Sequence, residues 1–139
     1  MKIRILGCGS SFGVPLIGNK FGKCDKNNPK NYRLRPSIII YYKNINILID
    51  TSPDLRQQLY KAKCTNIDAV LYTHIHSDHT AGLPDMRGIS LINNKIIPAY
   101  MSDEMKEQML SQYKYIFKGS KNYQPFMEIK KLNNNLKIN

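Results

Sequence analysis

The 139-residue chain has no tryptophan, only three cysteines and only three histidines. The cysteines are odd in number, stand at unrelated spacings and include no C-x-x-C pair, which argues against a disulfide framework. No apolar run approaches the roughly 20 residues of a membrane span, and the apolar stretch at the N-terminus is too short for a signal peptide. We therefore expect a cytoplasmic protein, with no membrane partner, whose thiols stay reduced.

Acidic residues are also scarce, with 10 Asp and Glu against 21 Lys and Arg, for a net charge of +11. Such an excess favours polyanionic partners or substrates through long-range attraction. The lysines are scattered, without a dense run or the arginine-aromatic interleaving of a nucleic-acid face. Two interpretations stay open: a functional basic surface, with nucleic acid among its partners, or a lysine-rich composition on a solvated exterior.

The length fits one domain, residues 1–139, and the pattern of apolar residues predicts an α/β fold. Strands are expected at residues 2–7, 38–42, 45–49, 68–74 and 97–101, with the second and third forming a hairpin. Helices are expected at 52–63, 85–92 and 102–117, with Ser52 and Ser102 as N-caps. The long segment 8–36 is expected to be functional or disordered, and the tail "KKLNNNLKIN" shows little pattern.

All three histidines lie in the stretch "YTHIHSDHTAGLPDMR", which follows the predicted strand at 68–74. Residues two apart at the end of a strand point to the same face, so His74 and His76 can present both imidazoles to one side. Asp78 and His79 follow where the chain turns away. Imidazole and carboxylate donors suit Zn, Mn, Fe or Ni, so this cluster predicts a metal site.

The segment "THIHSDH" resembles the H-x-H-x-D-H motif of the metallo-β-lactamase fold superfamily. The context agrees, because an earlier predicted strand ends at Asp50 in "NILIDTSPDL". The segments "GCGSSFGVP" and "GLPDMRGI" are similar to the branch that includes phosphoribosyl 1,2-cyclic phosphate phosphodiesterase, with ribonuclease Z more distant. The resemblance covers residues 1 to about 100.

The resemblance implies that His74 and His76 hold a first divalent metal and that Asp78 and His79 hold a second, zinc or manganese. It implies hydrolysis of a small phosphodiester by a water activated between the two metals, with Asp78 and Asp50 as the catalytic residues and Asp78 first of all a metal ligand. Asp50 would orient a ligand imidazole or metal-bound water. The alternative, that Asp50 caps the turn before Ser52, is compatible with this role.

Two arginines are candidate substrate-binding residues, Arg33 and Arg35, which would share a face if the chain is extended there. Arginine can bind phosphate through two parallel hydrogen bonds. The alternative is that these arginines cover a sheet edge or pair with acids.

No histidine follows His79, so the cluster offers about two ligands for each metal, where about three are needed. The resemblance implies that the remaining ligands come from the second half of the fold. We therefore expect the N-terminal half of an αββα sandwich: one mixed sheet with flanking helices and one apolar face that needs a partner.

Three hypotheses follow from this count. The first is a metallohydrolase that is active only when a second chain supplies the C-terminal half. The second is a non-catalytic remnant that binds at most one metal weakly. The third is a basic binding module in which the cluster holds a structural metal.

Overall fold

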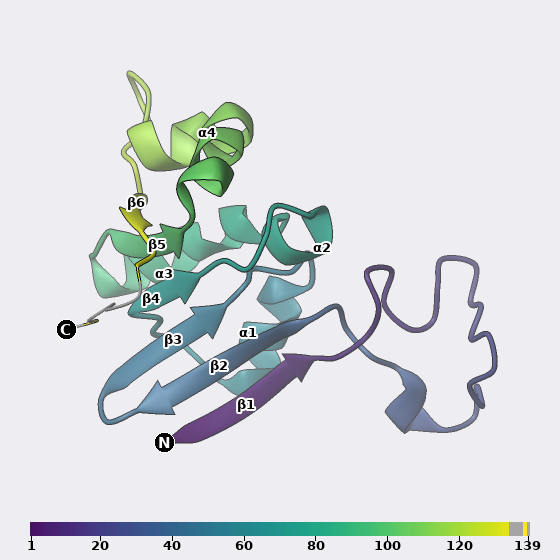
Figure 1. Ribbon diagram of the computed structural model, residues 1–139. Helices are drawn as coiled ribbons and strands as arrows, with labels where there is room; N and C mark the ends of the chain where they lie inside the picture. The colour runs from purple at the N-terminus through teal and green to yellow at the C-terminus, as the bar shows by residue number, and fades with distance from the viewer. Residues whose placement is uncertain (134–137, 139) are drawn as a thin grey trace.

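The computed structural model describes residues 1–133 and residue 138, which form a six-stranded sheet with helices packed against it (Figure 1). The strands lie side by side in the same order as along the chain. They are β1 (Lys2–Gly7), β2 (Ser37–Tyr42), β3 (Ile45–Ile49), β4 (Ala69–Leu71), β5 (Ile97–Met101) and β6 (Met127–Lys131). The predicted hairpin is confirmed as β2 and β3.

The first three strands pair antiparallel, and β3 to β6 pair parallel. A parallel pair needs a crossover connection, and helices supply it here: α1 (Leu55–Ala62), α3 (Met86–Asn93) and α4 (Asp103–Lys118). A short α2 (Ser77–Thr80), η1 (Pro29–Asn31) and η2 (Leu83–Asp85) complete the helical elements of the described residues. The predicted α/β class, one mixed sheet with flanking helices, is confirmed. None of these helices has the length and hydrophobicity needed to cross a bilayer.

One face of the sheet forms the core with the helices. The strand register aligns Ile39, Leu48, Val70 and Ala99 on this face, and all four are fully buried. The helices cover them with Leu55, Met86, Met105 and Met109 among other buried side chains. Burial of each large aliphatic side chain stabilises the fold by about 1.5–3 kcal/mol, so this face fixes the sheet on which the histidines are carried.

The opposite face of the sheet is also apolar. It carries two rows of paired isoleucines, which we call the isoleucine face: Ile3, Ile40 and Ile47 in one row, and Ile5, Ile38 and Ile49 in the other. Ile3 is 53% exposed and Ile5 is 66% exposed. In the described part of the chain no helix lies on this face (Figure 1). An apolar surface of this extent is typical of a face that another sheet or chain covers.

The predicted N-cap of the first helix is wrong. Asp54 is the residue that precedes α1, and its side chain makes no capping hydrogen bond. Ser52 is instead buried, where its hydroxyl donates to the side chain of Gln58 and accepts from the backbone of Asp54. The other predicted N-cap is confirmed, because the Ser102 oxygen accepts from the Met105 amide at 3.2 Å.

Some elements differ from the sequence prediction. The strand expected at 68–74 is shorter, since β4 ends at Leu71 and the histidines lie on the extended chain that follows. The four-residue α2 is too short to give a periodic pattern. The strand β6 covers the start of the tail, where the local sequence pattern predicts no strand. Pairing with β5 stabilises it there. The end of the tail, residues 134–137 and 139, lies outside the described residues.

The segment between β1 and β2 projects from the body of the molecule (Figure 1). Two isolated bridges, Val14 with Arg33 and Leu16 with Lys20, fold it back on itself. Two glycines near its base sit against the returning chain. A Cβ at Gly7 would lie 2.1 Å from the carbonyl oxygen of Arg35, and one at Gly9 would lie 2.7 Å from that of Arg33, so both positions require glycine.

Candidate metal centre

The three histidines lie together where the chain leaves β4. The rings of His74 and His76 have centroids 4.6 Å apart, as expected for side chains two residues apart on one side. The turn into α2 then brings back His79, whose ring centroid is 4.1 Å from that of His74. Asp78 joins them, with its Oδ2 atom 3.3 Å from Nε2 of His79. The structure therefore gathers the four residues that the motif singles out.

Asp50 lies behind this cluster, in the loop that follows β3. Its side chain is 6% exposed, and its Oδ2 atom lies 2.7 Å from Nδ1 of His79. The same carboxylate accepts the backbone amide of Thr73 at 2.8 Å and the Thr73 hydroxyl at 2.7 Å. Since a carboxylate only accepts, Nδ1 of His79 is the donor in this contact, and in the neutral ring Nε2 is then the nitrogen with the lone pair.

Thr73 extends the same logic to a second histidine. Its hydroxyl oxygen lies 3.0 Å from Nδ1 of His74. Because the Thr73 hydroxyl donates its single proton to Asp50, His74 must donate from Nδ1 to Thr73. Both imidazoles thus carry a proton on Nδ1, so that in the neutral form each offers Nε2 to a divalent metal, as a histidine ligand does.

The backbone also fixes the turn that carries Asp78 and His79. The Thr51 amide donates to the His79 carbonyl at 2.8 Å, and the Gly82 amide donates to the Thr51 carbonyl at 2.9 Å. At Gly82 the turn packs directly against the chain that follows β3, since a Cβ on Gly82 would lie 1.9 Å from the carbonyl oxygen of Ser52. Beneath it, the buried Tyr72 hydroxyl lies 3.0 Å from Oγ1 of Thr51, and burial raises the pKa of Tyr72, so the phenol stays neutral.

These residues fit part of a metal centre. The donor types suit zinc or manganese, and the tautomers of His74 and His79 leave the correct nitrogen available. Within residues 1–133 and 138, however, no three His, Cys, Asp or Glu side chains are already spaced as a complete metal-binding group. The rings pack on one another instead, and the predicted roles of these residues as metal ligands remain predictions.

The two candidate substrate arginines behave differently. Arg35 forms a two-pronged ion pair with Asp54, through Nε at 3.0 Å and Nη2 at 2.7 Å. These hydrogen bonds raise the pKa of Arg35 and lower that of Asp54, and the nearby charge of Asp78 also raises the pKa of Arg35. Arg33 instead donates to the sulfur of Cys24 at 3.5 Å, within the projecting segment. Pairing with an acid, one of the two interpretations of the arginines, therefore describes Arg35.

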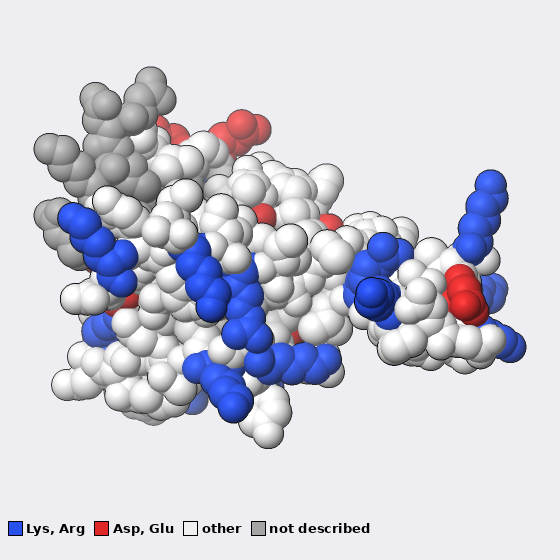
Figure 2. All heavy atoms as spheres, turned by 90° about the horizontal axis from the view of Figure 1, so that it is seen from below, with Lys and Arg blue, Asp and Glu red and all other residues white. Residues whose placement is uncertain are grey.

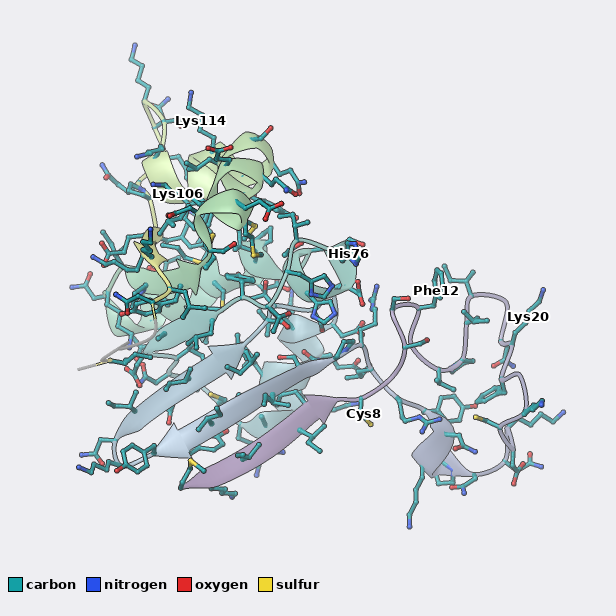
Figure 3. The ribbon with its side chains drawn as sticks, viewed as in Figure 1. Cys8, Phe12, Lys20, His76, Lys106 and Lys114 are labelled. Carbon is teal, nitrogen blue, oxygen red and sulfur yellow. The ribbon has the colours of Figure 1, made fainter. Side chains whose placement is uncertain are left out.

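A cavity of about 790 Å³ lies between the projecting segment and the histidine cluster. Its two walls contribute Phe12, Leu16, Ile17 and Lys20 on one side, and Arg35, His76 and Asp78 on the other. Figure 3 shows Phe12 and Lys20 on the projecting segment and His76 on the body of the molecule. The candidate metal ligands thus open onto a space large enough for a small organic phosphate.

Sequence reasoning missed Thr73 and Asp54. Thr73 precedes the motif directly, but its role depends on Asp50, which is 23 residues away. Asp54 belongs to the "SPDLR" segment, whose local pattern predicts only the start of a helix. Its carboxylate instead accepts both the side chain and the backbone amide of Arg35.

Residues 45–138 match the family model described as the beta-lactamase superfamily domain. The matched region contains Asp50 and the whole H-x-H-x-D-H motif. It covers more than half of the chain.

Three individual proteins are similar to this chain. An octanoyltransferase of Porphyromonas gingivalis is 35% identical over 119 residues, which cover 85% of this chain and 24% of that protein. A ribonuclease Z of Clostridium kluyveri is 32% identical over 88 residues, which cover 62% of this chain and 24% of that protein. The crystal structure of a diphosphatase from the PhnP family superposes with a TM-score of 0.80 at 34% identity, and covers 94% of this chain and 50% of that chain.

This chain therefore spans about a quarter of the length of these two relatives and half of the solved structure. The fold of the described residues is the half of a metallo-β-lactamase-type structure that carries the H-x-H-x-D-H motif. The family match and the superposition indicate the same fold, and the chain belongs to the family described as the beta-lactamase superfamily domain.

Proposed function

We propose that this chain is the metal-loading half of a hydrolase that cleaves phosphodiester bonds. The observation that carries the proposal is the pair of histidines, His74 and His79, whose Nδ1 atoms are held through Thr73 and Asp50 so that both Nε2 atoms are available. Two divalent metals bound there, zinc or manganese, would supply Lewis-acid activation of water and of a phosphoryl oxygen.

The residues of the chain would divide the work as follows. His74 and His76 would hold one metal, and Asp78 and His79 the other. Asp50 would fix the ring of His79 and its tautomer, since losing such a partner typically weakens metal binding about 10–100-fold. Arg35, held by Asp54 beside Asp78, would present positive charge to the phosphoryl group.

The relatives support phosphoryl chemistry. The 34% identical solved structure is named as a diphosphatase, and a ribonuclease Z is among the matched proteins. Both names denote cleavage at phosphorus. The octanoyltransferase is matched over the same 24% of its length as the ribonuclease Z, and its name denotes acyl transfer. The proposal does not follow that name, because imidazole and carboxylate donors in this cluster suit metal-assisted hydrolysis. The excess of lysine and arginine, spread over the body and the projecting segment in Figure 2, also suits an anionic substrate.

A partner that supplies the second half of the fold is part of the proposal. The cluster provides two candidate ligands for each metal, and the isoleucine face is apolar and partly exposed. A second sheet packed on that face would bury the isoleucines and bring further ligands to the same edge. The half-length match to the diphosphatase supports such a complement.

A non-catalytic remnant is the second candidate. It is favoured by one observation: in the described residues the four side chains pack against one another and form no complete metal-binding group. Such a chain would hold at most one metal, and weakly.

The two candidates separate when the missing half is supplied. The chain is co-expressed with the C-terminal half of the PhnP-family diphosphatase, and hydrolysis of bis(4-nitrophenyl) phosphate is measured with zinc or manganese. We expect metal-dependent turnover from the complex, none from the chain alone, and loss of turnover in the complex of the His76→Ala variant. A stable complex that holds two metals without any turnover would contradict the proposal. Failure to retain even one metal in the complex would favour the remnant.

A further inference from the structure

The cavity beside the metal ligands has an unusual wall for a site that takes phosphate. Three large apolar side chains of the projecting segment are exposed around it: Phe12 at 72%, Ile17 at 99% and Leu16 at 41%. Exposed apolar side chains that gather around a cavity mark a binding surface more often than those scattered singly. A bare phosphate or sugar phosphate would make little use of this wall.

The wall is held in place by the backbone. The Gly9 amide donates to the Leu34 carbonyl at 2.8 Å, and Val14 and Arg33 exchange two hydrogen bonds of 2.9 Å. Between these anchors, the Gly13 amide donates to the Ser10 carbonyl at 2.8 Å, closing the turn that carries Phe12. The backbone position of Phe12 beside the cavity is thus set by the fold of the segment.

Two cations complete the cavity. Arg35 uses Nε and Nη2 for Asp54, and among the described residues its Nη1 atom makes no hydrogen bond. Lys20 enters none of the ion pairs formed within residues 1–133 and 138. Both cations line the same cavity as Phe12, so an anionic group and an aromatic group can be bound side by side.

We propose that this cavity binds the base of a nucleotide, stacked on Phe12 and flanked by Leu16 and Ile17, with the phosphate between Lys20 and Arg35. This inference rests on the proposed function and narrows its substrate. The sequence predicts only a small phosphodiester, and this subsite favours an RNA end or another nucleotide ester over a cyclic ribose phosphate without a base. Stacking accounts for the choice, because an aromatic side chain binds the flat face of any base.

The absence of tryptophan from the chain makes the subsite directly observable. In the Phe12→Trp variant, the introduced indole is the sole tryptophan and still offers an aromatic face. Its fluorescence is titrated with adenosine 5′-monophosphate, ribose 5-phosphate and inorganic phosphate, with EDTA present so that no metal contributes. We expect quenching by adenosine 5′-monophosphate and a dissociation constant about tenfold lower than for ribose 5-phosphate. Equal affinity for adenosine 5′-monophosphate and ribose 5-phosphate, or no response to adenosine 5′-monophosphate, would overturn the inference.

Matched variants separate the two halves of the subsite. Calorimetric titration of the unmodified chain and of Phe12→Ala should show that the preference for the nucleotide is lost in the variant. In Lys20→Ala, binding of adenosine 5′-monophosphate and of ribose 5-phosphate should weaken by a similar factor. The control is Lys23→Ala, on the same segment but outside the cavity wall, which should bind both ligands as the parent does. Unchanged nucleotide preference in Phe12→Ala would contradict the stacking role.

The metal prediction is tested separately from the subsite. If the chain binds zinc but shows no nucleotide preference in EDTA, the subsite is wrong and the proposed function stands. If it shows the preference but His76→Ala leaves zinc binding unchanged, the metal centre is wrong and the cavity is a nucleotide site of another kind.

Discussion

The Oδ2 atom of Asp50 lies 2.7 Å from Nδ1 of His79, and this contact joins the end of β3 to the turn of the histidine motif. Asp50 adopts φ of +60°, a left-handed conformation that aspartate and asparagine tolerate better than other residues with a side chain. That conformation follows β3 directly, where the buried carboxylate meets both His79 and Thr73. The backbone thus favours aspartate or asparagine at this position, and the contacts with His79 and Thr73 favour the carboxylate.

Replacing Asp50→Asn separates these two reasons. Asparagine keeps the shape and the backbone conformation, but its amide donates to Nδ1 of His79 and so moves the proton to Nε2. We expect zinc affinity to fall about 10–100-fold, with a loss of about 1–2 kcal/mol in the free energy of unfolding. Calorimetric zinc titration and urea unfolding measure the two effects. The control is Asp68→Asn, which breaks a contact with Lys95 and should leave zinc affinity unchanged.

Gly82 and Gly88 form a matched pair for the backbone of the site. A Cβ at Gly82 would lie 1.9 Å from the Ser52 carbonyl, so Gly82→Ala should lower the free energy of unfolding by about 3 kcal/mol or more. At Gly88, within α3, a Cβ would meet no atom within 4 Å, and Gly88→Ala should raise stability by about 0.5–1 kcal/mol. Thermal unfolding followed by circular dichroism compares them. Equal stability of the two variants would contradict the close packing of this turn.

The ion pair of Arg35 with Asp54 predicts a pH dependence. The pKa of Asp54 is lowered in the folded protein, so the stabilisation is fully present above the unfolded value of about 3.9 and is lost as pH falls through the folded value. Asp54→Asn should therefore cost about 1 kcal/mol at pH 7, because solvent partly screens the pair, and close to nothing in strong acid. Urea unfolding of both proteins across this pH range makes the comparison. A difference that grows as the pH falls would contradict the pair.

The isoleucine face predicts self-association of the isolated chain. Ile5→Lys places a charge on this exposed face and should reduce association, seen by sedimentation, with little change in the thermal midpoint. The control is Ile39→Lys, one strand away on the opposite face, which buries an unpaired charge in the core and should unfold the protein. An Ile5→Lys variant that associates as strongly as the parent would show that another surface is responsible.

The elements most accurately predicted from the sequence are those that local pattern determines. The β2–β3 hairpin follows from two β-rich runs joined at Lys43, and the start of α4 follows from Ser102. The contacts of Asp54 and Thr73 were not predicted, because their partners lie 19 and 23 residues away along the chain. The strand β6 was not predicted for a similar reason, since it forms by pairing with β5, which lies far from it along the chain.

For the site, the sequence identified the histidine cluster and Asp50, because the spacing of the motif is itself the signal. It did not reveal the cavity, whose walls come from Phe12 and Lys20 on the projecting segment and from His76 after β4. The fold of that segment depends on bridges such as that between Val14 and Arg33, and these have no local signature.

Zinc retained per chain after exhaustive dialysis tests the central claim most directly. The measurement compares the parent with the His76→Ala variant, which lacks the imidazole that lies beside the ring of His74. The proposed half-site predicts that the parent retains zinc at fewer than about two ions per chain and that the variant retains at least tenfold less at the same free zinc. Equal zinc content in the parent and the variant would contradict the assignment of this cluster as a metal centre.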